Sequence, residues 1–225
     1  MTKTPEGDFE ILIASALTHV PPGGGDIGEE TQFNVEDGPL KGHKIKLVYG
    51  DYTKVMARIT EYHRKAAENA ANENQKKMQE SYVKSFETGS LEAFKDSQRF
   101  WIKDKGPMVE SNIGFVETYR DPQGVRGEWE GFAATVNLDR TKAFGALVAA
   151  AESSIPKLPW SKDFEKDKFL SPDFSSLEVL SFSGSGIPAG INIVSLDLML
   201  LFPSLLPSKA LRAIGHKPQF WLTLR

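Results

Sequence analysis

The segment SNIGFVETYRDPQGVRGEWEG, residues 111–131, places two strand-like runs on either side of a turn. Aromatic and β-branched residues, which favour strands, occur in both runs. The DPQG run at 121–124 consists of residue types that favour turns. This order predicts a β-hairpin with a longer loop.

Four polar side chains of this hairpin are candidate functional groups. Because side chains alternate between the faces of a strand, Glu117 and Tyr119 are predicted to share one face, and Glu128 and Glu130 to share a face across the turn. A carboxylate beside a phenol can hold a substrate amine and stabilise a developing oxyanion. A solvated hairpin face would show the same alternation, so the spacing leaves both interpretations open.

The composition is that of an ordinary soluble protein. The 225 residues are 25% charged and 40% hydrophobic, which allows one large domain or two small ones with a buried core. The net charge of -3 gives no electrostatic basis for binding nucleic acid, and nothing indicates a membrane surface.

Cysteine usage and the N-terminal residues bear on chemistry and location. The absence of cysteine excludes disulfides, a cysteine zinc site and thiol catalysis. The first residues, MTKTPEGDFE, lack the pattern of a secretory signal, so a cytoplasmic protein is expected. The apolar run 194–206 is interrupted by Asp197 and Pro203 and is too short to span a bilayer.

The first hundred residues combine strands with helices. Residues 9–17 are predicted to be either a buried strand or a helical turn, and residues 43–49 alternate as a strand does. Between them, the PPGGG run at 21–25 is predicted to be a surface loop. It lacks the Lys-Ser or Lys-Thr pair that a phosphate-binding loop would carry.

A long helical stretch, residues 52–85, is predicted to follow, with a break or bend at 69–74. Asp51 is the expected N-cap of this stretch. Val55, Ile59 and Tyr62 recur at helical spacing and are predicted to face the core.

Further helices and strands complete an α+β pattern. Ser90 is a candidate N-cap for a helix at 91–102, which would direct Phe94, Phe100 and Trp101 toward a core. A second helix is predicted at 139–151, with an apolar stripe of Phe144, Leu147 and Val148. A strand is expected at 177–182, and the segregation of strands from helices favours α+β over a doubly wound sheet.

Three segments resemble the dipeptidyl peptidase III family, zinc exopeptidases that remove dipeptides from peptide N-termini. They are ESNIGFVETYRDPQGVRGEWEGF at 110–132, FWIKDKGP at 100–107 and FEKDKFLSPDFSSLEVLSFSGSGIPAGINI at 164–193. The resemblance implies a partial small β-barrel lobe, the substrate-binding lobe, at 1–137 and 174–193. Residues 138–173 would form a helical excursion belonging to the catalytic lobe.

The resemblance also implies roles for individual residues. Glu117 would hold the free amine of the peptide with help from Asn192, and Tyr119 would donate a hydrogen bond to the oxyanion. Ala189 and Gly190 would offer main-chain groups to a peptide that pairs as an added strand. These assignments make short peptides the expected ligands.

The zinc site that the resemblance implies has no counterpart in the sequence. The family's zinc helix carries two histidines separated by four residues, with a glutamate after the first, whereas His19, His43, His63 and His216 are scattered singly. Zinc belongs to the complete family enzyme, and none is expected on this chain. The chain is therefore predicted to be an internal fragment that is inactive alone, or a non-catalytic peptide-binding or interaction fragment.

The resemblance ends after Ile193. The family continues with a Pro-Asn-Tyr-Asp-Asp run whose asparagine contacts the substrate, and Ser195 stands at that asparagine position. Residues 194–225 match nothing in the family and are predicted to be a divergent, non-native tail, although a short C-terminal helix is the alternative.

Overall fold

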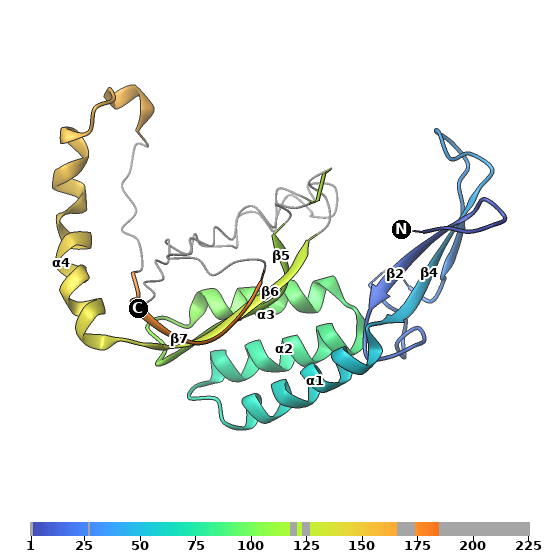
Figure 1. Cartoon of the computed structure of the whole chain (residues 1–225), viewed down its shortest axis with the longest axis horizontal. Helices are drawn as coiled ribbons and strands as arrows, with labels where there is room; N and C mark the ends of the chain where they lie inside the picture. Colours follow the sequence, from blue (N-terminus) through green and yellow to red (C-terminus); the bar gives the residue numbers. More distant parts are fainter. Residues whose placement is uncertain (1, 27, 118–120, 123–126, 166–173, 185–225) are drawn as a thin grey trace. The chain divides into compact units, whose positions relative to one another are not determined.

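A computed structural model of the chain describes residues 2–26, 28–117, 121–122, 127–165 and 174–184. It has the predicted mixed α+β class, with two β-sheets and several helices (Figure 1). The chain divides into two compact units, Met1–Asp104 and Lys105–Arg225. Among the described residues neither sheet closes into a barrel, so the barrel lobe remains a prediction.

The first unit contains a four-stranded sheet in the order β1-β2-β4-β3. Its strands are β1 (Thr2–Lys3), β2 (Phe9–Ala14), β3 (Gln32–Asn34) and β4 (Lys44–Asp51). β2 runs parallel to β4, while β1 and β3 pair antiparallel at the two edges. The structure therefore resolves the ambiguous run at 9–17 as a strand and confirms the strand predicted at 43–49.

Three helices follow the sheet: α1 (Thr53–Glu68), α2 (Glu73–Thr88) and α3 (Leu91–Lys103). α2 contacts both of the others and lies between them (Figure 1). The predicted break falls between α1 and α2, where the side chain of Asn72 accepts a 3.0 Å hydrogen bond from the amide of Gln75. Ser90 caps α3 as predicted, since its hydroxyl accepts a bond from the amide of Ala93.

The prediction that Asp51 caps α1 is wrong. Asp51 is the last residue of β4, pairs with Ala14 and accepts a 3.1 Å backbone bond from Ser15. The helix begins at Thr53, and its N-cap is Tyr52. The φ of Tyr52, 54°, lies in the left-handed region, and its side chain makes no capping hydrogen bond. The sheet ladder uses the backbone of Asp51, so the strand turns into the helix without a conventional cap.

The predicted core-facing stripe of α1 is also wrong. The side chains of Val55 and Tyr62 are 53% and 60% exposed, and Ile59 is half-buried. A different row of the helix is buried: Met56, Thr60, His63 and Ala67. α2 decides between the two rows, because the rings of Tyr82 and Phe86 on α2 pack against His63.

The core of the helical layer centres on Tyr82, which has no exposed surface. Its ring stacks on Phe86 at 5.6 Å and lies 6.1 Å from Phe94 between ring centroids. Phe94 and Trp101 are buried as predicted. Phe100 is half-buried instead, with the ammonium groups of Lys77 and Lys103 over its ring.

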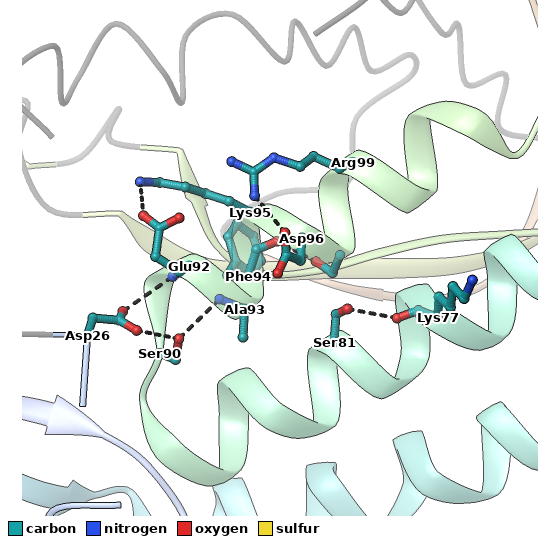
Figure 2. Close-up of polar contacts among 11 residues, drawn as sticks. Asp26, Lys77, Ser81, Ser90, Glu92, Ala93, Phe94, Lys95, Asp96 and Arg99 are labelled. Atoms are coloured by element: carbon teal, nitrogen blue, oxygen red, sulfur yellow. Dashed lines mark hydrogen bonds and ion pairs between the residues drawn. The ribbon is translucent and has the colours of Figure 1, made fainter. Parts of the chain in front are cut away.

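The carboxylate of Asp26, in a surface loop, forms hydrogen bonds with the first turn of α3. Asp26 accepts a 2.6 Å hydrogen bond from the hydroxyl of Ser90 and a 3.3 Å one from the amide of Glu92 (Figure 2). It also accepts a 2.6 Å hydrogen bond from the amide of Leu91. The first amides of a helix have no partner inside it, and a negative charge there is favourable. Asp26 and Ser90 together therefore satisfy the first turn of α3.

The second unit is built on a three-stranded antiparallel sheet in the order β5-β6-β7. Its strands are β5 (Val109–Glu117), β6 (Glu128–Val136) and β7 (Leu177–Ser183), which confirms the hairpin and the later strand. A small core on this sheet consists of Phe132, Ala134 and Leu177, with Val136, Val179 and Phe182 packed against it.

Helix α4 (Leu138–Ser154) connects β6 to the short 3-10 turns η1 (Ile155–Lys157) and η2 (Lys162–Phe164). None of its residues is buried, and Phe144 and Leu147 on the predicted stripe are 41% and 67% exposed. The assignment of this helix to a separate lobe remains a prediction. None of the helices in the described ranges is both long and apolar enough to cross a membrane.

Replacement of Asp26 by alanine is expected to lower the free energy of unfolding by about 1 kcal/mol, the usual loss when a helix N-cap is removed. Urea denaturation followed by circular dichroism measures this loss. Asp37→Ala is the matched control, because the carboxylate of Asp37 accepts a bond from the neighbouring amide of Gly38 within its own loop. Equal losses in the two variants would contradict the capping role of Asp26.

Acid is expected to destabilise the first unit through His63. Nδ1 of His63 lies 2.5 Å from Oε1 of Gln79, and burial lowers the pKa of His63 even though this hydrogen bond opposes the shift. The unfolded chain, with a histidine pKa of about 6.5, therefore binds the proton first as the pH falls. The contribution of neutral His63 to the free energy of unfolding should be fully present above about pH 6.5 and should decline below it.

The double variant His63→Leu/Gln79→Leu tests this pH dependence, because it removes both polar partners together. Between pH 8 and pH 5.5, the original chain should lose roughly 1 kcal/mol more unfolding free energy than the variant. Urea titrations at the two pH values measure the difference, and parallel losses would exclude His63 as the cause.

Candidate functional site

The candidate site lies at one end of the β5-β6-β7 sheet. In the antiparallel pairing of β5 with β6, the backbone partner of Gly114 is Glu130, that of Phe115 is Trp129 and that of Glu117 is Glu128. The pairing therefore places Glu117 and Glu128 across from each other immediately before the turn of the hairpin.

A register shift interrupts the alternation of β5 just before Glu117. It falls between Phe115 and Glu117, so Val116 is the extra residue of a β-bulge. The rings of Phe115 and Trp129 meet edge to face, 5.1 Å apart, on the regular side of the bulge. The bulge was missed from the sequence, because alternation of side chains carries no sign of an inserted residue. Bulges are common beside functional sites, where they redirect a side chain.

β7 ends at the same end of the sheet as β5. Ser183, the last residue of β7, pairs with Gly131, which pairs in turn with Ile113. β7 and β5 therefore run in the same direction, and the chain leaves β7 at the end of the sheet where β5 reaches Glu117. A Cβ at Gly184 would lie 3.7 Å from that of Glu130, so the exit from β7 is close to β6.

The predicted site residues are described to different extents. Glu117 lies in β5, where its backbone pairs with β6. Tyr119, Ala189, Gly190 and Asn192 lie outside the described residues, as does the segment that follows Ile193. The shared face predicted for Glu117 and Tyr119 is therefore untested, and so are the roles of all five residues.

A small core of side chains from β6 and β7 fixes how these two strands pair. Phe132 and Ala134 on β6 are almost fully buried, and Phe132 pairs with Phe182 on β7. Because side chains have a period of two along a strand, a slip of one residue would move these side chains to the opposite face. Burial of this core therefore fixes which residues of β6 and β7 pair with each other.

The described residues offer no group of three histidine, aspartate or glutamate side chains that could hold a metal ion. His63 is buried in the helical layer, His43 packs edge to face on Phe9, and His19 is exposed. His216 lies outside the described residues. The described donors therefore do not fit the catalytic zinc site that the resemblance implies, which would need about three convergent ligands.

A family model described as Peptidase family M49 matches residues 1–199. Dipeptidyl peptidase 3 of Dictyostelium discoideum is 48% identical over 195 residues, covering 87% of this chain and 26% of that protein. Dipeptidyl peptidase 3 of Rattus norvegicus is 49% identical over 189 residues, covering 84% of this chain and 25% of that protein. The chain thus spans about a quarter of the length of the curated relatives it matches.

Solved structures share the fold at lower sequence identity. DPP III from Caldithrix abyssi has a TM-score of 0.60 and 17% identity, covering 87% of this chain and 35% of that chain. Dipeptidyl-peptidase III from Corallococcus sp. strain EGB has a TM-score of 0.54 and 20% identity, covering 83% of this chain and 32% of that chain. These two likenesses concern the fold.

Replacement of Gly131 by alanine is expected to disrupt the pairing that supports the site. A Cβ at this position would lie 2.8 Å from Cγ1 of Ile113 and 3.0 Å from the carbonyl oxygen of Asn112. The free energy of unfolding should fall by about 1–3 kcal/mol, the usual cost of overpacking. Urea denaturation measures the loss.

Gly145→Ala in α4 is the control for Gly131→Ala, because a Cβ there meets open space in the structure. Alanine favours the helix over glycine, so this variant should be neutral or stabilising. A tolerated Gly131→Ala would mean that β5 and β6 do not approach as closely as the structure has them.

Proposed function

The chain belongs to peptidase family M49, and from this premise we propose that its hairpin sheet forms part of the substrate-binding side of a dipeptidyl peptidase. Such a hydrolase would remove dipeptides from the N-termini of peptides and would carry zinc in its complete form. The observation that supports the proposal is that β5 and β7 flank β6 in one sheet and run in the same direction, so both strands end at the same end of the sheet.

In this proposal Glu117 provides the negative charge that binds the free N-terminal amine of a peptide, with Asn192 assisting. A carboxylate and an ammonium group form a charge-assisted hydrogen bond, which is stronger than a neutral one. Ala189 and Gly190 offer backbone groups to the peptide, which lies as an added strand. The backbone pairing of Glu117 with Glu128 supports this role, because it brings two acidic residues to the end of the hairpin.

Tyr119 is proposed to act in the transition state. Its phenol donates a hydrogen bond to the oxygen that becomes negatively charged when water attacks the scissile carbonyl. In zinc peptidases the metal supplies the activated water. The donors described in this chain do not fit such a metal, so we propose that the chain binds peptides without hydrolysing them.

The purified chain tests this proposal in one series of measurements. We expect no stoichiometric zinc by plasma mass spectrometry, no release of arylamine from a dipeptidyl arylamide, and measurable binding of a short peptide by calorimetry. Stoichiometric zinc together with arylamine release would show that the chain is catalytically complete. Absence of peptide binding would instead remove the assignment of the hairpin sheet to the substrate site.

The role of Tyr119 is tested in a full-length family enzyme that carries residues 1–193 of this chain. Tyr119→Phe should lower kcat by about 100-fold, as the loss of one oxyanion donor usually does, with little change in peptide affinity. Tyr52→Phe is the control, because Tyr52 belongs to the first unit and its side chain is exposed. Equal losses of affinity and turnover would argue that Tyr119 contributes to binding alone.

A further inference from the structure

Helix α1 carries a second apolar stripe on its outer face. Tyr52 is 62% exposed, Val55 53% and Tyr62 60%, and Ile59 between them is half-buried. These four residues are here called the outer stripe. Val55, Ile59 and Tyr62 follow each other at spacings of four and three, so they lie along one side of the helix, and Tyr52 directly precedes its first residue. Single exposed apolar residues are common on protein surfaces, whereas a continuous row of them marks an interaction site.

The outer stripe is separate from the packing that holds α1 in place. Met56, His63 and Ala67 on another side of the helix are buried, and His63 packs against Tyr82 and Phe86 of α2. α1 is an edge helix of its layer, since α2 lies between it and α3 (Figure 1). Successive residues of a helix are about 100° apart, so the outer stripe adjoins the buried row and the two form one wide apolar face. α2 covers the part of this face that contains His63, while Val55 and Tyr62 of the outer stripe stay exposed.

A row of basic side chains borders the outer stripe. Arg58 follows Val55 by three residues and precedes Tyr62 by four, so it lies beside both. Lys54 precedes Arg58 by one helical turn, and the ammonium of Lys65 lies 5.2 Å from the centre of the Tyr62 ring. Lys65 is paired with Glu61 at 2.6 Å, and Arg58 also helps Lys65 to lower the pKa of the Glu61 carboxyl. Among the described residues, Lys54 and Arg58 lie within ion-pair distance of no carboxylate.

We propose that the outer stripe and its basic row dock an acidic amphipathic helix of another polypeptide. The apolar side of that helix would cover Val55, Ile59 and the two tyrosine rings, and its carboxylates would pair with Lys54 and Arg58. Tyrosine and arginine are the residue types that most often dominate interface energies. The local charge is opposite to that of the whole chain, whose net charge is -3, so the row selects an acidic partner at this site.

A synthetic peptide probe tests the proposal with the intact chain. The probe is a fluorescent helix of about four turns with leucines at positions i, i+3 and i+7 and glutamates beside them. Fluorescence anisotropy should show saturable binding, which Tyr62→Ala and Arg58→Glu should each weaken at least about tenfold. Both residues are exposed, so circular dichroism should show unchanged folding.

Two controls isolate the surface and the charge. Lys76→Glu makes the same change of charge at an exposed position of α2 and should leave the affinity for the probe unchanged. A probe with lysines in place of glutamates should not bind. Equal binding by the variants and the original chain would overturn the proposal.

Two further outcomes would also overturn it. Self-association of the chain that Tyr62→Ala abolishes, measured by sedimentation, would assign the outer stripe to a second copy. Binding to vesicles of anionic lipid that Arg58→Glu abolishes, without binding to the probe, would assign it to a membrane surface.

Discussion

Antiparallel pairing of β5 with β6 is the constraint on which the candidate site depends. It pairs Glu117 with Glu128 next to the turn of the hairpin, and the bulge at Val116 interrupts the alternation of side chains just before Glu117. The burial of Phe132, Ala134 and Leu177 on the same sheet opposes a slip of β7 along β6, because a slip would expose them. β7 pairs with the other edge of β6 and ends at the same end of the sheet as β5. The proposed chemistry therefore rests on hydrogen bonds between strands more than on any single side chain.

Local signals in the sequence predicted where the helices begin and end, but they did not predict which side of a helix is buried. Ser90 and the break before Asn72 are short-range features, because a cap and its amide lie within one turn of each other. The choice between the Val55–Tyr62 row and the Met56–His63 row of α1 depends on α2, whose rings lie many residues away in the chain. Asp51 was misplaced for a similar reason, since its backbone belongs to a ladder with a distant strand.

The candidate site was predicted mainly through resemblance, because its physical pattern is ambiguous. Alternating polar residues around Glu117 fit a solvated hairpin as well as a binding site, and only the matching segments distinguish the two. The family is confirmed by the match over residues 1–199, while the roles of Glu117, Tyr119, Ala189, Gly190 and Asn192 remain predictions. Convergence of such residues is a long-range property of the fold, which spacing along a chain does not contain.

Recognition of a free peptide amine by the hairpin sheet is the central claim. The most direct test is an NMR titration of the isotopically labelled chain with a short peptide and with its N-acetylated form. If the hairpin sheet binds the amine, the amides of Glu117 and of residues 189–192 should shift with the free peptide and shift much less with the acetylated one, which carries no positive charge at its N-terminus. Equal responses to the two peptides, or responses confined to other parts of the chain, would contradict it.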